Sequence, residues 1–203
     1  MGESFLSFSL LYRPQTIDLD GIFAYNRNMN EKSRPTIKRI VLRAVLTALC
    51  VFVYAWIFSN SAKTGTQSSS QSHTVTKAVQ KLVGVFAPNS FIATAAGEDF
   101  ERLHSAVRTA AHFCEFALLG ALLVWCYLSY TQDKAFAFLP FALVVLTPIF
   151  DEAMQSFTGG RAAEVIDLLV DTAGGLAGCV FALLAVWIGV AIYRKKARNG
   201  RKE

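Results

Sequence analysis

Charged residues are scarce in this chain. They make up 17% of its 203 residues, whereas 53% are hydrophobic. The mean hydropathy is +0.38, which is high for a soluble domain. Because the apolar residues come in blocks and do not alternate with polar ones, this composition points to a membrane protein.

Familiar catalytic and metal-binding motifs are missing as well. The sequence contains no CxxC pair, no HExxH and no nucleophile elbow of the G-x-S-x-G type. Each cysteine lies inside an apolar block, where a buried, reduced thiol is expected; the four are Cys50, Cys114, Cys126 and Cys179. These absences argue against disulfide exchange and against the common zinc hydrolases.

What the chain does contain is long apolar runs. They cover about residues 44–58, with 40–42 as an extension, and residues 113–130, 135–150 and 172–193. A bilayer core is spanned by roughly 20 apolar helical residues. The sequence therefore predicts an all-α polytopic membrane protein, a bundle of four transmembrane helices. A soluble four-helix bundle is the alternative, but its helices would need polar faces that these runs mostly lack.

Basic residues cluster on both sides of these runs and predict the orientation. Six lie before or at the start of the first run, between residues 27 and 43, and six follow the last run, between residues 194 and 202. Positive loops stay inside, so both termini are expected in the cytoplasm of a multi-pass plasma-membrane protein. The clusters adjoin apolar runs and lack interleaved aromatic residues, which argues against nucleic-acid binding.

Three regions follow from this pattern. Residues 1–36, which lack the basic start of a signal peptide, are expected to form a cytoplasmic tail. Residues 37–193 would form the membrane domain, and residues 194–203 a basic cytoplasmic tail.

Between the first two runs, apolar residues recur at helical spacing over residues 75–86, and Pro88 follows. We expect an amphipathic helix in this first extracellular loop, lying on the membrane or packing on the bundle.

Polar residues gather where the four runs end on the predicted outer side. Arg108, His112 and Glu115 share one helical face, as do Asp151 and Gln155. Asp167 and Asp171 share a face that continues into Gly174 and Gly178, a pair suited to close helix packing. We call the candidate ligand-binding residues the polar cluster: Ser59, Gln67, Ser68, Arg108, His112, Glu115, Asp151, Glu152, Gln155, Arg161, Asp167 and Asp171.

Carboxylates outnumber bases in this region. A network of ion pairs that fixes the packing of the helices is one interpretation. A purely structural network would need fewer groups, and ionisable residues at membrane depth usually serve a function. The surplus of acid favours a cationic ligand, a shared proton or a divalent cation, although the sequence identifies no cofactor.

Several of these residues, taken in order, resemble the VanZ-like family of bacterial membrane proteins over about residues 40–190. The pieces are Phe58-Ser59 with a Gln- and Ser-rich loop, Arg-x-x-x-His-Phe-x-Glu-Phe from Arg108, Asp-Glu-x-x-Gln from Asp151, Gly160-Arg161, and Asp-x-x-x-Asp-x-x-Gly-x-x-x-Gly from Asp167. Three positions depart from the family pattern: Thr109, Gly159 and Asp171 stand where lysine, proline and asparagine are common.

The resemblance implies a four-span fold in the cell envelope and a link to resistance against the glycopeptide teicoplanin. It implies no reaction. We therefore expect a non-enzymatic protein whose partners are the lipid bilayer and a lipid-linked or lipoglycopeptide ligand. A membrane enzyme or metal-dependent protein acting on a cell-wall or lipid intermediate is the alternative, with His112, Glu115, Asp151 and Asp167 as its acids and bases. A channel or transporter ranks third, because four spans leave little room for a pathway.

Overall fold

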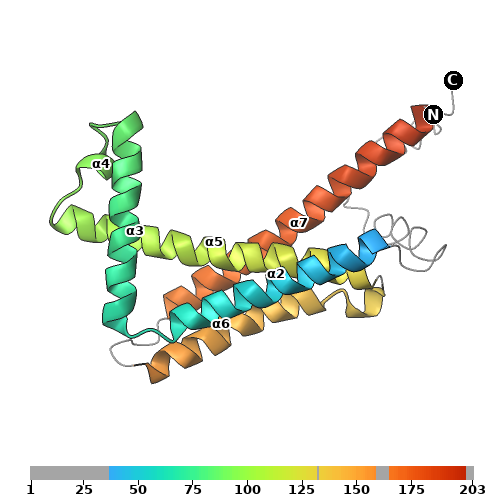
Figure 1. Ribbon diagram of the computed structural model, residues 1–203, viewed down its shortest axis with the longest axis horizontal. Coiled ribbons are helices and arrows are strands. Elements are labelled where there is room, and N and C mark those ends of the chain that lie inside the picture. The colour runs from blue at the N-terminus through green and yellow to red at the C-terminus, as the bar shows by residue number, and fades with distance from the viewer. Residues whose placement is uncertain (1–36, 132, 159–164, 200–203) are drawn as a thin grey trace, which may run out of the picture. The chain divides into compact units, whose positions relative to one another are not determined.

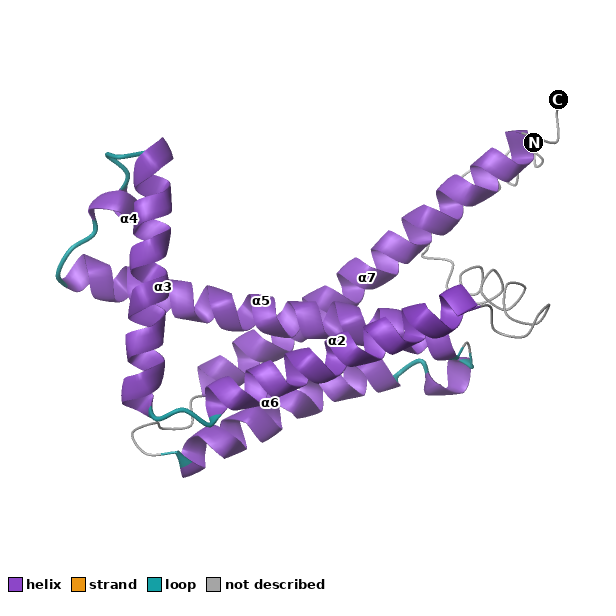
Figure 2. Cartoon of the chain, viewed as in Figure 1, coloured by secondary structure: helices purple, strands orange, loops and turns teal. Residues whose placement is uncertain are grey.

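The computed structural model describes residues 37–131, 133–158 and 165–199. Within these ranges all regular secondary structure is helical, as Figure 2 shows. Residues 1–36, predicted to form a cytoplasmic tail, lie outside the described residues, as does Arg161.

Four stretches are long and apolar enough to cross a membrane. They are α2 (Ile37–Ser61), α5 (Glu98–Tyr130), the short 3-10 helix η1 (Lys134–Phe136) together with α6 (Leu139–Phe157), and α7 (Val165–Asn199). The prediction of an all-α membrane protein with four transmembrane helices is confirmed. Pro140 lies in the first turn of α6, where a proline is tolerated, and Pro148 lies inside the helix.

The chain divides into two compact units. One is Pro35–Leu183. Of the other, the structure describes Leu184–Asn199, the final part of α7. The helix does not end with the apolar run at residue 193 but continues through the basic residues that follow, so the first part of the predicted tail is helical.

Helices α2, α5 and α6 pack against one another in the unit Pro35–Leu183 (Figure 1). Phe116 and Leu119 of α5, Val144 of α6 and Ile57 of α2 form the centre of the core, and each is at most 2% exposed. These apolar side chains fill the space between α2, α5 and α6. Their packing holds the ends of the three helices near one another.

Glycines let α7 approach α5 closely. A Cβ added at Gly174 would overlap the carbonyl oxygen of Phe113, and one at Gly178 would overlap that of Ala117. On α5, Gly120 has the same relation to the Gly175 carbonyl. Small residues of this kind allow helix backbones to meet in a membrane, where the hydrophobic effect does not drive helices together.

Large apolar side chains point outward from the same helices. Phe52 and Val51 of α2, Leu118 of α5, Ile149 of α6 and Phe181 of α7 are all exposed. Contiguous apolar surface on this scale is unfavourable in water but not in lipid. The outward faces of the helices are therefore suited to contact with acyl chains.

The segment between α2 and α5 is mostly helical. Helix α3 (Gly65–Phe86) crosses the N-terminal part of α5 (Figure 1), and the short helix α4 (Phe91–Thr94) follows it. Helix α3 begins ten residues before the predicted 75–86 helix, because Thr64 caps it: the Thr64 hydroxyl accepts from the Gln67 amide, and the Gln67 side chain accepts from the Thr64 amide. It ends just before Pro88, as predicted.

Candidate functional site

Polar residues from α2, α3, α5, α6 and α7 meet at one end of the helices of the unit Pro35–Leu183. Some of their hydrogen bonds join positions that are far apart in the chain, 55 residues for Asn60 and Glu115 and 90 residues for Ser61 and Asp151. Many of these residues were predicted from the sequence to form the polar cluster. The structure divides them into a buried part and a part that lines a pocket.

The buried part is centred on Asp151, which is 1% exposed. Its Oδ1 accepts a hydrogen bond from the Ser61 hydroxyl of α2, and its Oδ2 accepts one from Gln155 Nε2, one turn along α6, at 2.7 Å. A buried carboxylate is tolerated when hydrogen bonds satisfy both of its oxygens. Asp151 therefore ties the end of α2 to the end of α6.

A second buried acid, Asp171 of α7, faces His112 of α5. His112 Nδ1 lies 3.7 Å from Asp171 Oδ1, and neither atom has a hydrogen-bond partner among the described residues. Four other carboxylates lie close enough to repel charge on Asp171: Asp151, Asp167, Glu115 and Glu152. The carboxylates noted in the sequence thus gather around one His–Asp pair whose two facing atoms are buried and unsatisfied.

Arg108 and Asp167 form a third contact one turn farther out. Arg108 Nη2 lies 3.7 Å from Asp167 Oδ2, and both side chains are partly exposed. At that distance and exposure the pair contributes little stability, so the guanidinium remains available to a ligand. Two contacts, one helical turn apart, therefore connect α5 and α7: Arg108 with Asp167, and His112 with Asp171.

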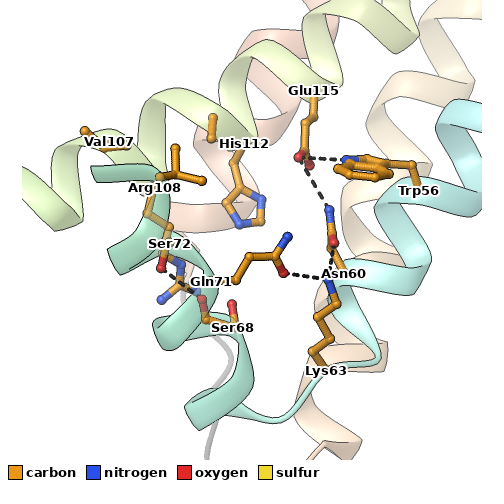
Figure 3. A pocket seen from close by; sticks show the side chains of 12 residues that line it. Trp56, Asn60, Lys63, Ser68, Gln71, Ser72, Val107, Arg108, His112 and Glu115 are labelled. Atoms are coloured by element: carbon orange, nitrogen blue, oxygen red, sulfur yellow. Dashed lines mark hydrogen bonds between the residues drawn. The ribbon is translucent and has the colours of Figure 1, made fainter. Parts of the chain in front are cut away.

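A pocket of about 160 Å³ opens beside these two contacts between α5 and α7 (Figure 3). Twelve residues from α2, α3, α5 and the turn between α2 and α3 line it: Trp56, Asn60, Lys63, Ser68, Gln71, Ser72, Val75, Val107, Arg108, Ala111, His112 and Glu115. Glu115 Oε1 accepts hydrogen bonds from Trp56 Nε1 at 3.1 Å and from Asn60 Nδ2 at 3.5 Å. The carboxylate that interrupts the second apolar run is thus satisfied by groups of α2.

Lys63 brings a cation to this pocket. Its ammonium donates to Asn60 Oδ1 at 2.8 Å and to Gln71 Oε1 at 2.6 Å (Figure 3). Both partners are neutral, and the ion pairs found among the described residues do not include Lys63. The ammonium is held in place without being neutralised, which favours the binding of an anionic group.

The remaining predicted residues of the polar cluster have different positions. Ser68 lines the pocket, Gln67 is used in capping α3, Ser59 is exposed, and Glu152 is half-buried. Sequence reasoning placed Ser59 in the cluster, whereas the structure brings Ser61 to Asp151. The two serines are two residues apart, so they lie on different faces of α2.

Eight of the twelve pocket residues were not among the predicted site residues, and four of these eight make the side-chain hydrogen bonds described above: Trp56, Asn60, Lys63 and Gln71. A signal was present for three of them. Trp56, Asn60 and Lys63 follow one another at intervals of four and three, which is the spacing of one helical face. Gln71 had no such signal, because its position depends on the angle at which α3 leaves α2.

Fold and site together define a class: a four-span membrane protein with a polar cluster and a small pocket at one end of its helices. Residues 45–188 match the VanZ/LLP1 family, and the protein belongs to that family. The resemblance drawn from the sequence is thereby confirmed. No curated protein and no solved structure matches the chain.

Proposed function

We propose that this VanZ/LLP1 protein binds an anionic, lipid-linked or lipidated envelope molecule at the pocket formed by α2, α3 and α5. The observation that carries the proposal is the Lys63 ammonium, which is positioned by two neutral amides in a pocket that also receives Arg108. Lysine and arginine together suit a phosphate or carboxylate group.

The size of the pocket limits which part of the ligand enters it. Pockets that enclose a drug-sized molecule have volumes of roughly 300–1,000 Å³. A cavity of about 160 Å³ admits only a small polar group. The ligand would therefore insert its charged group and leave the rest of the molecule outside.

The surface beside the pocket suits an acyl chain. Trp56 and Val75 line the pocket and are about half exposed, and Phe52 stacks next to Trp56 on the outward face of α2. This apolar surface continues onto the faces that would contact lipid. A ligand with a charged head and an acyl chain would satisfy both surfaces at once.

The charge pattern favours an extracellular position for this pocket. The two clusters of six basic residues lie near Ile37 and after Tyr193, at the opposite ends of α2 and α7 from the polar cluster. If those ends are cytoplasmic, the polar cluster faces the cell exterior. There it would meet lipid-linked wall precursors and lipoglycopeptides such as teicoplanin.

The test compares a lipidated with a non-lipidated glycopeptide. The protein is expressed in a susceptible Gram-positive host, and growth inhibition by teicoplanin and by vancomycin is measured. We expect selective protection against teicoplanin, reduced by Lys63→Ala and by His112→Ala because each removes a polar group that lines the pocket. Membrane levels of each variant are measured in parallel.

Lys77→Ala is the matched control, since Lys77 is an exposed lysine of α3 outside the pocket. It should retain full protection. Equal protection by wild-type protein, Lys63→Ala and Lys77→Ala at equal membrane levels would refute a role for the pocket. An absence of any protection would refute the teicoplanin proposal.

A membrane enzyme is the second candidate, and the His112–Asp171 pair is the observation that favours it. A buried carboxylate beside an imidazole can hold and transfer a proton. Purified protein is incubated with a radiolabelled lipid-linked wall precursor, and the products are separated. Turnover that is lost in His112→Ala would support an enzyme, and unchanged substrate after long incubation would argue for a binding protein.

A further inference from the structure

A second polar group lies away from the pocket, where α3 crosses α5. It consists of His73 of α3 and of Glu101 and His104 on the polar N-terminal part of α5. One ligand atom from each residue lies within 4.8 Å of the others. Among the described residues no other three histidine, cysteine or acidic side chains converge in this way.

Ser72 contacts one ring nitrogen of His104, Nε2, and not the other. The Ser72 hydroxyl can donate its one proton to a backbone carbonyl of the preceding turn, that of Ser68 at 2.9 Å (Figure 3) or that of Ser69 at 3.1 Å. Its oxygen also lies 2.7 Å from His104 Nε2. When the hydroxyl proton is directed to a carbonyl, Nε2 is the donor of this contact. In this tautomer Nδ1 carries a lone pair.

That lone pair faces a group that cannot donate to it. His104 Nδ1 lies 3.8 Å from Glu101 Oε2, and an ionised carboxylate is an acceptor only. His73 Nε2 lies 3.9 Å from the same oxygen. Three atoms that can each ligate a metal thus converge, and in this tautomer of His104 no proton lies between Nδ1 and Oε2, an arrangement that a cation would satisfy.

The two imidazoles lie against each other. Their ring centroids are 4.1 Å apart, and His73 also packs against Phe100, with ring centroids 5.2 Å apart. His104 has a side chain that is 12% exposed, whereas that of Glu101 is 64% exposed. The cluster therefore combines two packed imidazoles with an exposed carboxylate that has room to move toward an ion.

We propose that His73, Glu101 and His104 bind a divalent transition-metal ion of the Zn²⁺ class. Two imidazole nitrogens and one carboxylate oxygen suit that ion, with water in the fourth position of a tetrahedron. Zinc–ligand distances of about 2 Å require the three side chains to close by only a few tenths of an ångström to about one ångström. Ser72 acts as the outer partner that fixes the tautomer of His104.

Metal binding at this position would join α3 to α5. Ser72 connects the proposed metal site with the pocket, since it contacts His104 and also lines the pocket. The metal would hold α3 in position over the pocket, whatever ligand the pocket takes. This inference does not depend on the proposed function.

The experiment uses the full chain in detergent, purified with a histidine-free tag and stripped with a chelator. Zn²⁺ is titrated calorimetrically, and Co²⁺ is added separately to record the visible spectrum of a tetrahedral site. We expect one Zn²⁺ per chain. His73→Gln and His104→Gln should each weaken binding at least about tenfold, and Ser72→Ala about tenfold, as loss of an outer partner does.

Glu101→Gln and Glu98→Gln form a matched pair, since both acids are exposed in the first turn of α5. Only the former should weaken binding, and because its side chain is exposed it leaves the fold intact. The proposal is overturned if the folded protein binds no Zn²⁺. It is equally overturned if His73→Gln, His104→Gln and Glu101→Gln all bind like wild type.

Discussion

At the scale of single residues, burial decides which polar groups matter. Ser59 and Ser61 have the same side chain and lie in the same turn of α2. Ser59 is exposed, whereas Ser61 is 2% exposed and bonds to Asp151. A buried hydrogen bond lost on one side leaves the other partner unsatisfied, which costs more than the bond itself contributes.

We therefore expect Ser61→Ala to lower the free energy of unfolding by about 1–3 kcal/mol, because it leaves Oδ1 of Asp151 without the Ser61 proton. Ser59→Ala should change it by less than about 0.5 kcal/mol. Thermal unfolding in mild detergent measures both. Equal melting temperatures for the two variants would show that the Ser61–Asp151 bond does not stabilise the fold.

At the scale of helices, α3 depends on its cap. The polar first half of this helix, with its run of serines, has no long apolar face to pack, so the bonds between Thr64 and Gln67 supply much of the local order. Loss of an N-cap hydroxyl costs about 0.5–2 kcal/mol.

Thr64→Ala should therefore speed hydrogen exchange of the Gln67 amide and its neighbours in the first turn of α3. The same substitution at Ser70, an exposed serine inside the helix, should leave exchange unchanged or slower, because alanine is the better helix former. Faster exchange in both variants would mean that the serine side chains, and not the cap, hold this half of the helix.

The contact between α5 and α7 gives a second prediction at this scale. Gly178→Ala places a Cβ against the Ala117 carbonyl and must push the helices apart, at a cost of about 1–3 kcal/mol. Gly189→Ala meets nothing within 4 Å and should be neutral or stabilising by up to about 1 kcal/mol. Thermal unfolding of the two variants in detergent is the measurement. A destabilised Gly189→Ala, or an unaffected Gly178→Ala, would contradict the packing.

At the scale of the whole molecule, we expect four crossings to place both ends of the membrane domain on the cytoplasmic side and α3 on the outer side. In a Cys114→Ser background, which removes the exposed native thiol, Ser70→Cys should react with a membrane-impermeant maleimide in intact cells. A cysteine introduced at Lys196 should react only after the cells are lysed. The reverse pattern would place the pocket in the cytoplasm and remove its access to extracellular ligands.

The sequence by itself determined the class of this protein. An apolar run of bilayer length is stable in lipid as a helix, because a helix satisfies its own backbone hydrogen bonds. The four spans could therefore be predicted without knowing which helices pack against one another. The pairs Asp151–Gln155, Arg108–His112 and Asp167–Asp171 followed from helical spacing alone, since residues four apart on a helix must share a face. The glycines of α7 indicated close packing, though not against which helix.

Only the tertiary structure decided what meets across helices. Asp151 bonds to Ser61 and not to Ser59, and His73 packs against His104; both contacts join segments that are distant in the chain. The position of Lys63 between Asn60 and Gln71 depends on how α3 leaves α2. Such contacts depend on the rotation of each helix about its axis and on the angle of α3 across α5. Those quantities are set by side-chain packing in three dimensions, which no local spacing encodes.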